Sequence, residues 1–126
     1  MSANEADYLT KAHRMLAQAQ AMNPADAPES VVHLSYYAMF HAATAVLLRH
    51  RASVAITHSG LIGAFGRLTK DLDESARRHG RALNRAEDLR LRADYGVTYD
   101  DLAEAAENLR NEALAFVTFC ESLLQE

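Results

Sequence analysis

The segment 29–51, ESVVHLSYYAMFHAATAVLLRHR, constrains the fold more than any other part of the chain. Its apolar side chains recur at steps of three and four residues, which is the spacing of one face of an α-helix. The opposite side is nearly as apolar, and a helix that is apolar around most of its circumference is normally the central helix of its domain. The sequence therefore predicts a long buried helix around which the others pack.

Three polar aromatic side chains, His33, Tyr37 and His41, recur every four residues in this segment and therefore share one stripe of the predicted helix. Polar groups buried in an apolar interior are costly unless they find hydrogen-bond partners. A histidine in such a helix is therefore either a hydrogen-bonded packing residue or part of a functional site. The stripe alone leaves both readings open.

Stop and start signals bound the first two helices. The first helix, 3–22, ends before Pro24, because the residue that precedes a proline is pushed out of helical geometry. Asp26 and Glu29, three residues apart, predict a capping box at the start of the second helix, which runs to about Arg51. The first helix has only a narrow apolar stripe, which we expect to lie against the second.

A short third segment is predicted next, capped by Thr57 or Ser59. Three glycines recur in it every three residues, at Gly60, Gly63 and Gly66. This spacing favours close helix packing, because a phosphate-binding loop would need a preceding strand and a lysine. The stretch 71–80 is polar, and it predicts a loose helical turn or a mobile loop.

The last third of the chain predicts two more helices. One covers 81–95 and ends at Gly96, which supplies a left-handed stop. Thr98 caps the final helix, with Asp101 three residues on, and an apolar seam continues from there to the C-terminus. Because no stretch alternates with a period of two, the predicted fold is all-α, a single domain over 1–126 forming a four- to five-helix bundle.

The net charge of −4 hides a segregation of charge along the chain. Arginine and lysine dominate between 67 and 92, whereas the chain beyond 94 is acidic apart from Arg110. Complementary faces of neighbouring helices would explain this pattern, and so would a basic patch for phosphate or nucleic acid. Composition does not separate the two explanations.

The single cysteine, Cys120, lies among apolar residues and is predicted to be a core residue, so the chain forms no internal disulfide. This fits a reducing compartment. No apolar run reaches the roughly 20 residues needed to cross a bilayer, and the N-terminus lacks the pattern of a signal peptide. We therefore expect a cytoplasmic protein that is not attached to a membrane.

Three motifs in order resemble the HEPN domain family: YYAMFHAA at 36–43, THSG at 57–60, and ADYG at 93–96 after Arg90. The likeness covers nearly the whole chain and is closest to the small single-domain prokaryotic branch. It implies a helical bundle that commonly dimerises. Many relatives are encoded beside small nucleotidyltransferases and act as toxin–antitoxin or defence components, and several cleave RNA without a metal.

The family's ribonucleases carry an arginine and a histidine with four to six residues between them. Arg90 has no histidine in that window, so the nuclease motif is not carried over to it. Arg51 and His58 have the spacing, but they lie at the exit of the second helix, and we interpret that pair as accidental.

The candidate site therefore rests on other groups. Arg90 and Asp94 are one helical turn apart and can pair, either as an ordinary clamp of the helix end or to aim the guanidinium at a phosphate. Arg90 and His41 are the candidate catalytic residues, because histidine and arginine suffice for metal-free phosphodiester chemistry. The candidate ligand-binding residues are Tyr37, His58, Asp94 and Tyr95.

The sequence thus predicts a HEPN-like, dimeric toxin-type, defence-type or interaction component of a two-component system with a nucleotidyltransferase, which binds nucleotide or RNA. One alternative is a metal-independent endoribonuclease, and another is a structural dimerisation module without catalysis. We expect no cofactor, and no metal, because neither a Glu-x-x-His pair nor a His-x-x-x-His pair with a glutamate is present.

Overall fold

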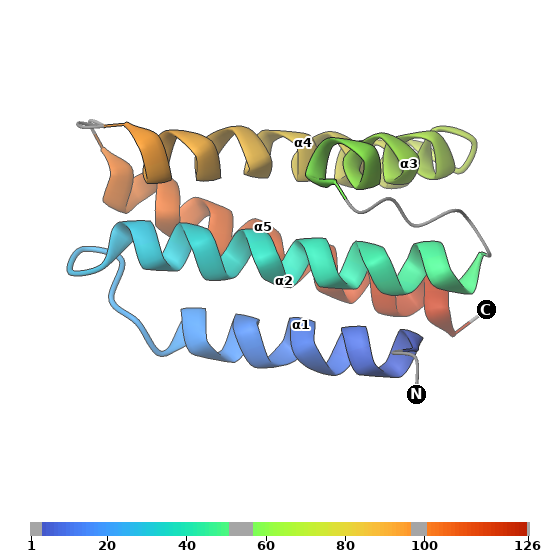
Figure 1. The fold of residues 1–126 in the computed structure, drawn as a ribbon, viewed down its shortest axis with the longest axis horizontal. Helices are drawn as coiled ribbons and strands as arrows, with labels where there is room; N and C mark the ends of the chain where they lie inside the picture. Colours follow the sequence, from blue (N-terminus) through green and yellow to red (C-terminus); the bar gives the residue numbers. More distant parts are fainter. Residues whose placement is uncertain (1–3, 51–56, 97–100, 126) are drawn as a thin grey trace.

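The computed structural model describes residues 4–50, 57–96 and 101–125, and these ranges contain five α-helices (Figure 1). No strand occurs in them, so the all-α prediction is confirmed. The helices are α1 (Glu5–Gln20), α2 (Pro28–Arg49), α3 (His58–Lys70), α4 (Glu74–Tyr95) and α5 (Leu102–Leu124).

Helix α2 is the centre of the bundle, as its apolar circumference predicts. It lies between α1 on one side and the pair α3 and α4 on the other, while α5 crosses behind it (Figure 1). Its largest core side chains, Tyr36, Met39 and Leu47, are fully buried. Phe116 and Cys120 of α5 are buried in the same core, which confirms the prediction for the cysteine.

By length and composition alone α2 could cross a membrane, contrary to the expectation that no apolar run is long enough. Most of that apolar stretch, 72%, is buried inside the bundle, which is what the core helix of a soluble protein also shows. The apolar surface of α2 is therefore used by its neighbouring helices.

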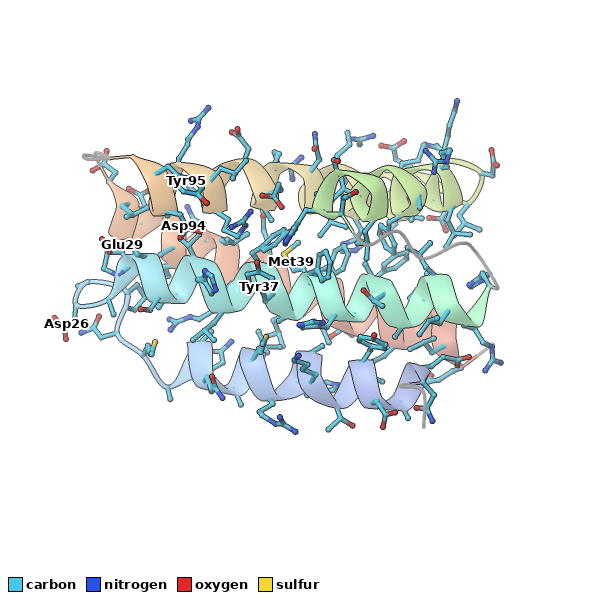
Figure 2. The ribbon with its side chains drawn as sticks, viewed as in Figure 1. Asp26, Glu29, Tyr37, Met39, Asp94 and Tyr95 are labelled. Carbon is cyan, nitrogen blue, oxygen red and sulfur yellow. The ribbon has the colours of Figure 1, made fainter. Side chains whose placement is uncertain are left out.

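The predicted capping box of α2 is wrong. The residue before the helix is Ala27, no side chain caps it, and Asp26 and Glu29 lie apart at the turn (Figure 2). Asn23 organises this turn instead, because its side chain accepts from the Ala25 N–H and its carbonyl accepts from the N–H groups of Asp26 and Ala27. Proline at the first helical position has no N–H to cap.

Helix α4 begins seven residues earlier than the sequence predicts, at Glu74 instead of Arg81. Asp73 caps it by accepting a hydrogen bond from the Ala76 N–H at 2.9 Å. The interpretation of 71–80 as a loose turn or mobile loop is therefore wrong beyond its first three residues. Glu74 supports the added turns, because it pairs with Arg77 and Arg81 one and two turns on.

The close approach of α3 and α4 joins Gly80 of α4 to Thr69 and Gly66 of α3. A Cβ built on Gly80 would lie 2.6 Å from Thr69 Oγ1 and 3.7 Å from Gly66 Cα, whereas one on Gly66 would meet no atom within 4 Å. Gly80 therefore lets α4 pass close to α3. One of the three glycines predicted from their spacing, Gly66, lies at this contact, but the contact does not require it to be glycine.

Two helix boundaries predicted from the sequence also differ from those in the structure. Gly96 follows α4 with φ −79° and ψ 139°, an extended conformation and not the predicted left-handed stop. Asp101, predicted inside the last helix, is the residue before α5 and has φ 60°. Thr98 and the connector 51–56 lie outside the described residues. Thr57 caps α3 as predicted, by accepting from the Gly60 N–H at 3.1 Å.

Candidate functional site

Side chains from three helices meet beside the middle of α2. Helix α2 supplies Tyr36 and Tyr37, α3 begins with His58, and α4 supplies Glu87 and Arg90. We call these five residues the arginine cluster. The cap by Thr57 fixes the first turn of α3, which carries His58, against α2. One turn of α4 places the glutamate and the arginine on the same helix face.

Arg90 is held on both ends of its guanidinium. Its Nη2 and Nε donate to Glu87 Oε1 at 2.5 and 3.2 Å, and its Nη1 donates to Asp94 Oδ2 at 3.0 Å. The guanidinium carbon lies 5.2 Å from the ring centre of Tyr36 and 5.8 Å from that of Tyr37. The side chain is only 11% exposed. Charge-assisted hydrogen bonds and cation–π contacts therefore fix this arginine.

His58 joins α3 to both neighbouring helices. Its Nδ1 lies 2.7 Å from Tyr36 Oη and 3.2 Å from Glu87 Oε2, and its Nε2 lies 3.5 Å from Tyr37 Oη. The side chain is 37% exposed, so solvent reaches it. When Nδ1 carries the proton, it faces a carboxylate and leaves Nε2 able to accept a proton, which is the arrangement of an oriented base.

Burial and pairing shift two pKa values in this cluster. Burial first, and then hydrogen bonding to the negatively charged Glu87, raise the pKa of Tyr36, so its hydroxyl stays protonated and can donate. Burial pulls the pKa of Arg90 down, but its hydrogen bond to Glu87 and that carboxylate's charge outweigh burial and raise it. The cluster thus holds a permanent cation beside a permanent hydrogen-bond donor.

The cluster opens to solvent at the last turn of α4. Asp94 lies there on the side that faces α2 (Figure 2), and its side chain is 27% exposed. Its Oδ1 lies 3.8 Å from Nδ1 of the half-exposed His33, whose ring centre is 4.7 Å from that of Tyr37. A carboxylate, a half-exposed histidine and a tyrosine ring therefore lie together at this end of the cluster.

The structure brings together Arg90, Tyr37, His58 and Asp94 of the residues predicted from sequence. Their roles in binding stay a prediction. The alternative spacing pair, Arg51 and His58, cannot be placed, because Arg51 lies outside the described residues.

His41 lies one turn beyond Tyr37 on the same stripe of α2, at the end that α1 covers. Its ring stacks on Tyr8 at a centroid distance of 6.1 Å, and only 9% of the residue is exposed. Burial first, and then the charge of Lys11, lower the pKa of His41 to about 4, so it is neutral near pH 7. Its contacts are with Tyr8, Tyr37 and Phe40, and this placement separates it from Arg90.

Tyr95 is also separated from the cluster. It follows Asp94 in the last turn of α4 (Figure 2), but 78% of it is exposed. Adjacent residues of a helix point about 100° apart, so the turn that brings Asp94 toward α2 carries Tyr95 away. The expectation that Tyr95 lies near Arg90 is therefore corrected.

Sequence reasoning missed two members of the cluster, Glu87 and the hydroxyl of Tyr36. Glu87 lies three residues before Arg90, and a carboxylate at that spacing is a standard helical partner for an arginine. Tyr36 lies in the apolar segment of α2 and is fully buried there. Its hydroxyl nevertheless needed a partner, and this need was the available signal.

Most arginines of α4 pair with acids of their own helix. The pairs are Arg77 and Arg81 with Glu74, Arg90 with Glu87 and Asp94, and Arg92 with Asp88. Arg85 reaches across to Glu112 of α5 at 3.8 Å. Pairing within one helix therefore accounts for more of the basic segment than pairing between helices. In the described part of the chain, no group of three His, Cys, Asp or Glu side chains could hold a metal ion.

Comparison with known proteins gives two findings. The HEPN domain family model matches residues 6–123. A protein of Methanocaldococcus jannaschii that is named as a putative toxin is 34% identical over 92 residues, which cover 73% of this chain and 67% of that protein.

Proposed function

This chain belongs to the HEPN domain family, and from that premise we propose that it is a toxin- or defence-type component of a two-component system. The name of the Methanocaldococcus relative supports the toxin part of this proposal. The partner is a nucleotidyltransferase, as the family resemblance implies, and the chain acts as a homodimer. An open reading frame for a small nucleotidyltransferase beside the gene for this chain would support the pairing, and its absence would count against it.

The ligand we propose is RNA or a nucleotide, bound where the arginine cluster opens to solvent. The observation that carries this proposal is the fixed guanidinium of Arg90, beside His58 and over the rings of two tyrosines. A planar guanidinium that is held in place can recognise phosphate oxygens, and aromatic rings beside it can stack on bases. Glu87 and Asp94 offset the charge of Arg90. We therefore expect RNA or nucleotide to bind with modest affinity, and binding to depend strongly on how the phosphate is oriented toward the guanidinium.

A second candidate function is metal-independent RNA cleavage, which the position of His58 beside Glu87 favours. Nε2 of His58 would take the proton from a ribose 2′-hydroxyl, whose oxygen attacks the adjacent phosphorus. The bond from phosphorus to the 5′-oxygen breaks, and that oxygen takes a proton from solvent water. The products are a 2′,3′-cyclic phosphate and a 5′-hydroxyl, and Arg90 would offset the charge that develops on the phosphate.

Labelled mixed RNA, incubated with the purified chain with and without a chelator, separates these functions. Binding is measured by fluorescence anisotropy, and cleavage by the appearance of 2′,3′-cyclic phosphate ends. We expect Arg90→Lys to weaken binding by about tenfold, because lysine keeps the charge and loses the planar fork. If the chain is a nuclease, His58→Gln lowers cleavage by at least about 100-fold, whereas it weakens binding by less than about tenfold.

Tyr95→Phe is the matched control, because this exposed tyrosine lies outside the arginine cluster. It should change neither binding nor cleavage. Cleavage that is undiminished in His58→Gln would point to a contaminating nuclease. If the wild-type chain neither binds nor cleaves RNA, and nucleotide titration gives no heat, the third alternative is left, a structural dimerisation module.

A further inference from the structure

An open groove lies between α3 and α4, away from the arginine cluster. Three glycines line it, Gly63, Gly66 and Gly80, together with three cations, Lys70, Arg77 and Arg81. The two arginines also pair with Glu74, which does not line the groove. We call the glycines its floor and the cations its rim. Its volume is about 410 Å³, and a cavity of ~150 Å³ is already enough to hold a benzene ring. The groove therefore has room for more than one side chain of an occupant.

Packing inside the bundle does not explain all of these glycines. Gly80 is needed, because a Cβ there would lie 2.6 Å from Thr69 Oγ1. A Cβ on Gly66 would meet nothing within 4 Å, and one on Gly63 would meet only the flexible end of Arg67, at 3.4 Å. Larger side chains at these two positions would thus fit the isolated chain but would fill the groove.

The turn that joins α3 to α4 carries an apolar side chain and acidic side chains, which complement the glycines and the cations of the groove. It reads Asp71-Leu72-Asp73, and Leu72 is one of the large apolar residues that the bundle leaves exposed, at 45%. Both aspartates are exposed, although one oxygen of Asp73 caps α4. The same helical hairpin therefore carries a cation-rimmed groove and a leucine flanked by two carboxylates.

We propose that two copies of this chain pair through the α3–α4 hairpin, with the acidic turn of each copy in the groove of the other. A two-fold interface must be self-complementary, and this hairpin carries both halves of the contact. When the two hairpins run antiparallel, the partner's Leu72 lies over the glycine floor and the flanking aspartates face the cationic rim. The inference rests on the homodimer of the proposed function and identifies its contact surface.

Protein is a better occupant of this groove than RNA. None of the side chains that line it is aromatic, so it offers no platform on which a base could stack. Glycine floors instead suit the close approach of a side chain or backbone from another protein.

The size of the face sets the expected affinity. Helix α3 has 13 residues and is about 20 Å long, and two helices side by side are about 20 Å wide. Such a face gives an interface at or below the low end for stable complexes, about 1,200 Å² in total. We therefore expect association in the micromolar range.

Sedimentation equilibrium of the whole chain, from about 1 to about 100 µM, tests the proposal. The wild-type chain should pass from one to two chain masses over this range. Gly66→Leu fills the groove, and Leu72→Glu removes the apolar side chain that enters it. Each should weaken dimerisation at least about tenfold, while circular dichroism shows the same helix content and melting is no less cooperative.

Leu91→Glu is the matched control, because Leu91 is another exposed leucine, at 41%, on α4 outside the groove. It should leave dimerisation unchanged. A wild-type chain that stays monomeric at the highest concentration overturns the dimer itself, and the RNA assays above still decide the arginine cluster. If both groove variants still dimerise, or if only Leu91→Glu weakens dimerisation, the proposed contact surface is wrong. The homodimer itself would then stand.

Discussion

Helix α2 buries polar rings on two sides, and the two sides solve the same problem differently. Toward α1, His41 is covered by Tyr8 and the pKa of its ring is lowered to about 4, so it is held as a neutral group. Toward α4, Tyr36 is fully buried beside a glutamate and an arginine that keep their charges by pairing with each other. The α1–α2 interface keeps its histidine uncharged, whereas the α2–α4 interface keeps a charged arginine and pairs it with a charged glutamate.

The comparison teaches that the two interfaces fail under different conditions. A buried histidine that is held neutral costs stability when the solution is acid enough to protonate it in the unfolded chain. A buried ion pair is insensitive to such a change near neutral pH, but it becomes costly when one partner is removed. We therefore expect the α1–α2 interface to respond to pH and the α2–α4 interface to respond to single substitutions.

The largest effect is expected for Glu87→Ala. Removal of this carboxylate leaves the 11%-exposed Arg90 without its nearest partner and takes the ion pair from His58. Loss of one partner of a buried pair costs about 3 kcal/mol. Urea unfolding followed by circular dichroism measures the loss, as a lower midpoint at an unchanged slope.

Glu87→Gln and Arg90→Leu test the physical reason for that loss. The amide keeps the size of the glutamate and loses its charge, so it should still cost more than about 1 kcal/mol. Because the two charges act as one unit, the double change Glu87→Leu with Arg90→Leu should cost less than the sum of Glu87→Leu and Arg90→Leu measured singly. Strict additivity would show that the two side chains act independently.

The next effect is the pH response of the α1–α2 interface. The pKa of His41 is lowered to about 4 in the folded chain, against about 6.5 in an unfolded one. The unfolded state therefore binds the proton first, and stability that is fully present above pH 6.5 is lost as the pH falls toward 4. By pH 5 the loss is about 2 kcal/mol from this group.

His41→Leu isolates this contribution. Leucine cannot be protonated, so the free energy of unfolding of the variant should fall less between pH 7 and pH 5 than that of the wild-type chain. Urea titrations at the two pH values give the difference. Equal slopes with pH in the two proteins would mean that His41 is protonated as readily in the folded chain as in the unfolded one.

The all-α fold could be predicted because the sequence signals for its helices are local or follow from the burial of apolar side chains. The apolar circumference of α2 fixed the central helix, and the apolar seam near the C-terminus fixed α5. The start of α4 was missed because the polar stretch before Arg81 lacks an apolar face, although the Asp73 cap is a local signal that could have found it. Gly80 lies there against Thr69, and Glu74 pairs along the helix. The Asp26 capping box failed because Asn23, three residues before Asp26, organises the turn.

The site could be predicted in part, for a related reason. Arg90 and Asp94 are one turn apart, so their pairing follows from helix geometry alone. The approach of His58 to Tyr36 joins residues 22 apart and depends on how α3 docks, which no local pattern encodes. His41 and Tyr37 do share a stripe, but α1 covers one end of it and not the other. Which helix covers each face of α2 depends on tertiary packing, and a local sequence pattern does not predict it.

A smaller effect is expected for Tyr36→Phe. The hydroxyl that lies 2.7 Å from His58 Nδ1 is removed, and this leaves a part-buried ring nitrogen without that partner. The cost of one such hydrogen bond is about 1 kcal/mol. The matched change on the α1 side, Tyr8→Phe, should cost less than about 0.5 kcal/mol, because Tyr8 contacts His41 through its ring. Thermal melting of the two variants compares them, and equal shifts would count against the difference between the interfaces.

The smallest effect is expected for Arg92→Ala, and it shows what burial adds. Arg92 pairs with Asp88 at a spacing of four residues, the same as between Arg90 and Asp94 on the same helix, but the two side chains are 61% and 64% exposed. An exposed pair of this kind contributes less than about 0.5 kcal/mol and is screened by salt. Urea unfolding of Arg92→Ala and Arg90→Ala should therefore differ several-fold in the loss of stability. If the two losses were equal, helical spacing alone would set the strength of these pairs, and enclosure by α2 would add nothing to the arginine cluster.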